Sequence, residues 1–257
     1  MNTIIKSSLT PPLIKIIQKS FCDEEKIIFE FGSRYGEDST ALAAAFPNAH
    51  IYTFECNPNT LEICRNECKR YQNITLTEKA VSNINKKVEF YPINKELTKT
   101  TWGDGNQGAS SLLQASGEYP IEEYIQDKIL ADAITLKSFM NQHAIKNINF
   151  LWMDIQGAEL MALEGLDNYI EKVNIIYTEV EFMQIYKDQP LFSDIKKFLE
   201  EHCFKFAGFL SRSQFSGDAI FINERHKDMY YEVKKIIKKE KSLKMFIKEK
   251  LDLLFKY

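Results

Sequence analysis

Several residue types that would mark a special class of protein are scarce in this sequence. Glycine occurs 10 times, proline 7 times, cysteine 5 times and histidine 4 times in 257 residues. The cysteines are too few and too scattered for a small disulfide-stapled secreted fold, so we expect reduced thiols in a cytoplasmic protein. The histidines lie far apart, and Cys64 and Cys68 have no second cysteine pair beside them. No zinc site is therefore expected.

Long hydrophobic runs are also missing. No apolar run approaches the roughly 20 residues of a membrane span, and the first residues, MNTIIKSSLTPPLIKIIQ, do not read as a secretory signal. The formal net charge of −3 gives no general attraction to nucleic acid, so no nucleic-acid partner is expected. With 44% apolar and 27% charged residues, the composition is that of an ordinary soluble globular protein.

What the sequence does contain is an apolar strand that runs into a glycine turn. Residues 27–36 read IIFEFGSRYG, with bulky apolar residues first and then Gly32 and Gly36. In an open α/β sheet, such a turn presents backbone groups to a nucleotide. The GxGxxG spacing of a dinucleotide fingerprint is absent.

Short apolar strands and helices alternate around this turn. Strands are expected at 26–31, 50–54 and 74–78, with helices near 38–46 and 60–71 between them. This order predicts a parallel sheet with right-handed crossovers.

The rest of the chain adds further strands and a closing pair. The expected elements are an N-terminal helix after Thr10, an edge or hairpin strand at 88–93, a strand at 133–136 followed by a helix through Met140, strands at 148–154 and 173–180, a helix at 192–202 and an antiparallel pair at 204–210 and 219–223. Together they predict an α/β, Rossmann-like fold with a mostly parallel sheet.

We expect one domain over residues 1–229, with its core at 27–223, and a C-terminal extension at 230–257. The extension has nine lysines and four acids. Its apolar residues are spaced for one helical face: Val233, Ile236, Ile237, Phe246, Ile247, Leu251 and Leu254. This basic amphipathic helix fits peripheral contact with a membrane surface. The alternative, which we favour, is packing on its own domain or on the second subunit of a homodimer.

A long polar loop at 98–120 interrupts the pattern and holds four of the ten glycines. Long loops within compact domains are commonly functional or disordered, and Trp102 favours an ordered lid or substrate wall. The candidate acceptor-binding residues are Trp102, Asn106, Ser110, Ser111 and Glu179.

The charges near the first turn favour a cationic adenosine ligand. Glu30 and Asp38 disfavour a pyrophosphate, and Glu55 at the end of the second strand can accept ribose hydroxyls. Ala80 and Val81 follow the third strand, where they can flank an adenine ring. The combination indicates S-adenosylmethionine as the cofactor. The candidate cofactor-binding residues are Glu30, Gly32, Ser33, Gly36, Asp38, Glu55, Cys56, Ala80, Val81 and Asp154.

At this point the chain resembles the FkbM-type S-adenosylmethionine-dependent methyltransferases. The resemblance covers roughly residues 27–223 and rests on FEFGSRYG at 29–36, FECNP at 54–58, KAVS at 79–82 and MDIQGAE at 153–159 with LEG at 163–165. It implies a seven-stranded methyltransferase sheet and O-methylation, frequently of sugars in glycan or polyketide pathways. Two departures stand out: Ser33, Arg34 and Tyr35 replace the small residues usual in the first turn, and Gln156 replaces a common glutamate.

Methyl transfer to a hydroxyl requires an aligned nucleophile and a group that accepts its proton. Asp154 is expected nearest to the reaction, with Glu159 and Glu181 as alternative bases. Asp154 and Glu159 flank a predicted helix N-terminus, whose dipole favours the ionised carboxylate. Magnesium could be bound by Asp154, Glu179, Glu181, Asp104 or Asn106, but no spacing requires a metal.

The sequence thus predicts an S-adenosylmethionine-dependent O-methyltransferase that acts on a sugar or glycan hydroxyl, as in surface polysaccharide biosynthesis. One alternative is a nicotinamide-dependent oxidoreductase of similar layout, against which the missing GxGxxG and the acidic turn speak. The other is a non-catalytic protein of this fold that docks on a membrane or partner through its basic tail.

Overall fold

The computed structural model describes residues 6–254, and describes side chains as far as Phe246. The helices are α1 (Pro11–Ser20), α2 (Glu37–Ala45), α3 (Pro58–Cys68), η1 (Gln107–Ala109), α4 (Leu136–Gln142), α5 (Glu159–Glu164), η2 (Asp167–Lys172), α6 (Phe192–Glu201) and α7 (Lys227–Leu254). The strands are β1 (Ile27–Phe31), β2 (His50–Phe54), β3 (Ile74–Thr77), β4 (Ala80–Val81), β5 (Lys87–Phe90), β6 (Ile129–Ile134), β7 (Ile148–Met153), β8 (Val173–Glu181), β9 (Phe204–Arg212) and β10 (Ser216–Asn223).

The predicted mostly parallel sheet is confirmed. Seven strands lie in the order β3-β2-β1-β7-β8-β10-β9, and within this sheet β10 runs antiparallel to both of its neighbours, β8 and β9, while the other pairs are parallel. All five residues of β1 are buried, as expected of a strand in the middle of a covered parallel sheet. The strand order reverses direction between β1 and β7. In such sheets, ligands bind at this switch point, outside the carboxyl ends of the strands.

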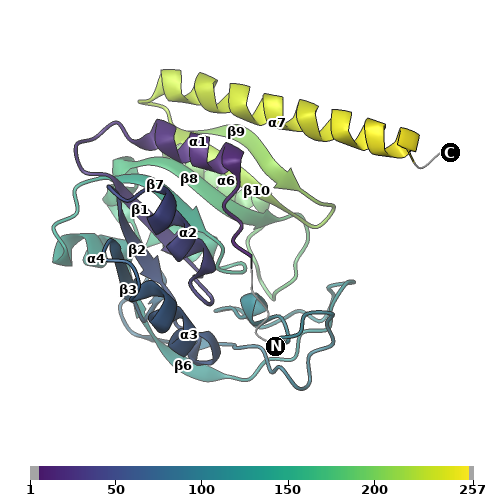
Figure 1. Cartoon of the computed structure of the whole chain (residues 1–257). Helices are drawn as coiled ribbons and strands as arrows, with labels where there is room; N and C mark the ends of the chain where they lie inside the picture. The colour runs from purple at the N-terminus through teal and green to yellow at the C-terminus, as the bar shows by residue number, and fades with distance from the viewer. Residues whose placement is uncertain (1–5, 255–257) are drawn as a thin grey trace.

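Helices cover both faces of the sheet (Figure 1). One apolar layer joins the sheet to α1, α2 and the first half of α7, and the other joins it to α4, α5 and α6. Alternate residues of β7 divide between the layers: Phe150 and Trp152 belong to the first, Leu151 and Met153 to the second. This alternation places Asp154, the next residue in the chain, in register with the α1 face.

A second, smaller sheet lies beside the first. It has the order β4-β6-β5, with β5 antiparallel to β6, so the segment predicted as a hairpin partner or edge strand is an edge strand here. The strand expected at 133–136 is wrong in its bounds. It runs from Ile129 to Ile134, because the Thr135 side chain accepts the N–H of Ser138 and caps α4.

The start of α7 packs on its own domain, against α1 and β9. Val233 and Ile237 are buried there, whereas Leu243 and Met245 are exposed. The side chains of 247–257, including the expected apolar positions Ile247, Leu251 and Leu254, lie outside the described residues. Between Lys6 and Leu254, no helix has the length and apolarity that a membrane crossing requires. All five cysteines are free thiols.

Hydrogen bonds to the buried side chain of Glu30 link the turn after β1 to α2 and β2. Its carboxyl group accepts hydrogen bonds from the hydroxyls of Ser33 (2.8 Å), Ser39 (2.7 Å) and Thr53, which belong to the turn, α2 and β2. Burial raises the pKa of Glu30 to about 8, although these three bonds act in the opposite direction. The protonated form is therefore favoured in the folded protein.

The turn itself requires glycine at position 32. Gly32 has φ +84°, and a Cβ there would lie 1.9 Å from the carbonyl oxygen of Asp154. Gly32→Ala should lower the free energy of unfolding by roughly 2–4 kcal/mol in urea denaturation. Gly103→Ala is the matched control, since its Cβ would meet nothing within 4 Å. Equal stability of the two variants would contradict the close approach.

Glu30 makes stability depend on pH. Because its pKa rises from 4.5 in the unfolded chain to about 8 in the folded one, its contribution is full below pH 4.5 and is lost as pH rises through 8. Between pH 5.5 and 8.5, wild-type protein should lose about 3 kcal/mol more unfolding free energy than Glu30→Gln. Urea titrations at both values measure this. Glu78→Gln, on an exposed carboxylate, should follow the wild type; parallel loss in Glu30→Gln would refute the assignment.

Candidate active site

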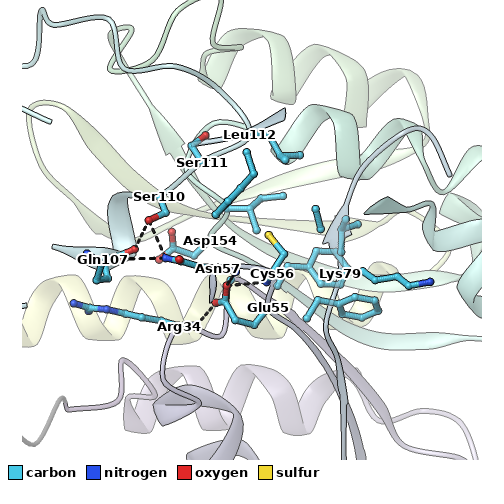
Figure 2. A pocket seen from close by; sticks show the side chains of 18 residues that line it. Arg34, Glu55, Cys56, Asn57, Lys79, Gln107, Ser110, Ser111, Leu112 and Asp154 are labelled. Atoms are coloured by element: carbon cyan, nitrogen blue, oxygen red, sulfur yellow. Dashed lines mark hydrogen bonds between the residues drawn. The ribbon is translucent and has the colours of Figure 1, made fainter. Parts of the chain in front are cut away.

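A pocket lies at the carboxyl ends of β1, β2 and β7. It is covered by residues 107–112 of the polar loop (Figure 2). It is lined by Phe31, Gly32, Arg34, Phe54, Glu55, Cys56, Asn57, Lys79, Ala80, Val81, Phe90, Gln107, Gly108, Ser110, Ser111, Leu112, Asp154 and Ile155. Its free space is only about 60 Å³.

Glu55 is the most firmly placed charged group in the pocket. It follows β2 directly, and its carboxylate accepts the N–H groups of Arg34 (2.6 Å), Cys56 (2.8 Å) and Asn57 (2.6 Å), as Figure 2 shows. A carboxylate offers about four acceptor positions, so about one stays open for a ligand hydroxyl. Burial raises the pKa of Glu55 to about 7, opposed by these three bonds.

Two bulky residues of the first turn, Arg34 and Tyr35, connect the turn to the polar loop. Arg34, at φ +51°, forms an ion pair with Asp104 and lies 5.4 Å from the ring of Trp102. The hydroxyl of Tyr35 donates to Asp104 at 3.0 Å. Ser33 is buried beneath the turn on Glu30. The departure from small residues thus adds a link between the turn and the loop.

The loop is also joined to the end of β2 by a polar clamp that the sequence analysis missed. The amide of Asn57 donates to Ser110 at 3.0 Å and to Gln107 at 3.4 Å, and Asn59 donates to Gln107 at 3.0 Å. Asn57 also caps α3, accepting the N–H of Asn59. The cap was readable from Asn57-Pro58, but its partners across the pocket were not.

The predicted cofactor residues divide into two groups. Those that line the pocket are Gly32, Glu55, Cys56, Ala80, Val81 and Asp154. Those that lie outside it are Glu30, Ser33, Gly36 and Asp38. Gly36 begins α2 with φ +84°, and Asp38 accepts the hydroxyl of Ser7 and the N–H of Ser8, each at 2.6 Å. Asp38 thereby ties α2 to the segment before α1.

The predicted acceptor residues are likewise spread. Ser110 and Ser111 line the pocket, and Ser111 donates to the carbonyl of Gln156 at 2.7 Å. Trp102 is 52% exposed, and Asn106 donates to Glu122 at 2.7 Å; both lie outside the lining. Glu179 accepts from the amide of Gln156 at 2.8 Å, and lines a different cavity.

Of the three candidate bases, only Asp154 lines the pocket. Its carboxylate is exposed and accepts from the amide of Gln156 at 2.7 Å. Glu159 and Glu181 are each 2% exposed, and burial raises the pKa of both, that of Glu159 to about 7. Burial thus acts on Glu159 in the direction opposite to the helix dipole that was expected to keep it ionised, at the start of the six-residue helix α5. Among the side chains that the structure describes, no cluster of three acidic, histidine or cysteine residues suits a metal.

Comparison with known proteins matches the chain to methyltransferases. A family model described as the methyltransferase FkbM domain matches residues 30–206. A curated relative, the 2-O-methyltransferase NoeI of Sinorhizobium fredii (strain NBRC 101917 / NGR234), is 24% identical over 167 residues, or 64% of this chain and 67% of its own length.

Among solved structures, TrmK of M. capricolum with S-adenosyl-homocysteine is 12% identical over 84% of this chain and 69% of its own, with a TM-score of 0.44. An S-adenosylmethionine-dependent methyltransferase from Aquifex aeolicus is 9% identical over 84% and 90%, with a TM-score of 0.43. Both TM-scores lie below 0.5, so these likenesses support no conclusion on their own. The family match spans most of the chain. It includes the carboxyl ends of β1, β2 and β7, where the pocket lies. The chain belongs to the FkbM family of S-adenosylmethionine-dependent methyltransferases.

Proposed function

We propose that this protein transfers a methyl group from S-adenosylmethionine to a hydroxyl of a sugar or glycan intermediate, in the cytoplasm. The observation that carries the proposal is the buried Glu55 carboxylate at the carboxyl end of β2, which accepts hydrogen bonds from three backbone N–H groups. Support for oxygen as the methyl acceptor comes from the curated relative, which is named a 2-O-methyltransferase. The sugar class rests on the family resemblance in the sequence.

The residues of the pocket fit an adenosine group. Glu55 can accept a ribose hydroxyl, and the buried apolar side chains of Ala80 and Val81 can contact adenine. Nε of Arg34 is buried and has no hydrogen-bond partner among the described residues, so it is free to donate to a ligand. Gly32 keeps the floor clear of a side chain where β1 and β7 meet.

In this proposal, Asp154 acts on the acceptor hydroxyl. When bound, S-adenosylmethionine supplies a methyl group that its sulfonium already activates. The remaining requirement is that the acceptor oxygen is aligned and gives up its proton as it bonds to the methyl carbon. Asp154 is exposed at the edge of the pocket, where its carboxylate can accept that proton, and Gln156 holds its orientation.

The cofactor site predicts a loss of affinity in Glu55→Gln. The new amide nitrogen cannot accept a backbone N–H, so at least one of the three bonds is replaced by a repulsive contact. We expect S-adenosylhomocysteine to bind roughly 10- to 100-fold more weakly, as 1.5–3 kcal/mol for a charged hydrogen bond implies. Isothermal calorimetry measures this, with Glu78→Gln on the exposed ion pair to Arg65 as control. Unchanged affinity in Glu55→Gln would remove the ribose assignment.

If Asp154 is the base, Asp154→Asn should slow methyl transfer without weakening the binding of S-adenosylhomocysteine. Turnover should fall roughly 10²- to 10⁴-fold, while affinity for S-adenosylhomocysteine stays within about threefold. S-adenosylhomocysteine release, with mass spectrometry of methylated methyl glycosides, measures the rate. Asp132→Asn, at an exposed position on β6, is the control. If Asp154→Asn turns over like the wild type, the proton goes elsewhere.

A further inference from the structure

A second cavity opens on the α1 face of the sheet and meets the first pocket at Asp154, which lines both. Its volume is about 520 Å³, within the range of small-molecule sites. It lies between the start of α1, the ends of β7, β8 and β10, and the middle of α7. The lining residues are Ser8, Thr10, Pro11, Pro12, Trp152, Asp154, Tyr177, Glu179, Leu210, Ser211, Asp218, Glu240 and Lys244.

The floor of this cavity combines two aromatic rings with polar strand ends. Trp152 and Tyr177 lie on neighbouring strands with ring centroids 5.2 Å apart and edge-to-face geometry. Two residues further along β8, Glu179 is directly paired with Asp218 on β10. Aromatic faces beside carboxylates and hydroxyls suit a ligand with an apolar ring face and a rim of hydroxyls.

The ionisable groups that line the cavity are mostly acidic. Four carboxyl groups, Asp154, Glu179, Asp218 and Glu240, face a single cation, Lys244. Lys244 is already engaged, since it lies 3.7 Å from Glu240 and donates to the carbonyl of Leu210 at 3.3 Å. Burial, together with repulsion from Asp154, raises the pKa of Asp218 to about 6 and that of Glu179 well above its ordinary range. A cation in the cavity would relieve this repulsion, and an anion would increase it.

Most of the walls lie outside the part of the chain that matches the family model. The segment Ser8–Pro12 precedes residue 30, and Asp218, Glu240 and Lys244 follow residue 206. The floor residues Trp152 to Glu179 lie within it. The floor of the cavity therefore lies within the matched methyltransferase domain, and most of its walls lie outside the matched region.

We propose that this cavity is the acceptor pocket and that it takes a hydroxyl-rich ring carrying a protonated amine, with α7 as one wall. The inference rests on the proposed methyltransferase function, which it makes specific: the acceptor is an amino sugar or a ring of like chemistry. Asp154, at the junction of the two cavities, is then shared between acceptor and cofactor sides. Anionic sugars are excluded by the carboxylates.

The protein offers its own reporter for this test. Its two tryptophans are Trp102, which lines neither cavity, and Trp152, which lies in the floor. In Trp102→Phe, emission therefore reports on Trp152 alone. With S-adenosylhomocysteine at saturation, methyl glucosaminide should change this emission in a saturable titration. Methyl glucoside should bind at least tenfold more weakly, and methyl glucuronide should give no response at the same concentrations.

Two further substitutions in the Trp102→Phe protein test whether the charge of the cavity, rather than its shape, determines binding. Asp218→Asn should weaken binding of methyl glucosaminide roughly 5- to 50-fold, whereas Lys244→Gln should strengthen it about two- to fivefold. A change that merely disturbed the fold would weaken binding in both. Asp132→Asn, on the exposed side of β6, should leave the titration unchanged.

The outcomes distinguish this inference from the function on which it rests. Equal binding of the glucoside or glucuronide, or equal effects of the two charge variants, would overturn the amine acceptor. Competition between methyl glucosaminide and S-adenosylhomocysteine would also overturn it, because the cavity would then hold the methionine end of the cofactor. If S-adenosylhomocysteine binds in calorimetry while no sugar alters Trp152, the acceptor pocket is refuted and the cofactor site stands. Failure of S-adenosylhomocysteine itself to bind would refute the proposed function.

Discussion

The carboxyl ends of β1 and β7 approach so closely that residue 32 has no room for a side chain. The carbonyl oxygen of Asp154 occupies the place where a Cβ would be, and the N–H of Asp154 in turn donates to the carbonyl of Phe31 at 3.1 Å. This contact fixes where the turn after β1 stands relative to the acid after β7. The pocket around Glu55 on one side and the acidic cavity on the other both take their shape from that junction.

Three carboxyl groups lie around this junction and have different roles. Glu30 is satisfied by three hydroxyls and ties strands to a helix, so it is structural. Glu55 is satisfied by three backbone N–H groups and keeps about one acceptor position for a ligand. Asp154 alone is exposed and lines both cavities. The partners of each acid, rather than its place at a strand end, separate the three roles.

Sequence patterns were enough for the sheet and for part of the site. Buried apolar runs and glycine turns predicted the strands, and the parallel topology then placed Gly32, Glu55 and Asp154 at one edge. The links from Asn57 to Gln107 and Ser110, and from Arg34 to Asp104, join a loop without periodicity to the sheet, so no local pattern encodes them. Glu30 and Asp38 were read as ligand contacts because a residue's charge is visible in sequence, whereas the hydroxyls that satisfy it are not. The wall formed by Glu240 and Lys244 depends on how the last helix docks.

The contact between α1 and α7 joins the first and last helices of the chain (Figure 1). Leu13, Ile16 and Ile17 share one apolar layer with Val233 and Ile237. On the ribosome, α1 emerges long before α7, so this layer cannot close until α7 has been made. Until then, the apolar sides of α1, β9 and β10 stay open to solvent and to other chains. Folding of this face therefore has to wait for the synthesis of α7, while the β1–β2 half can form earlier.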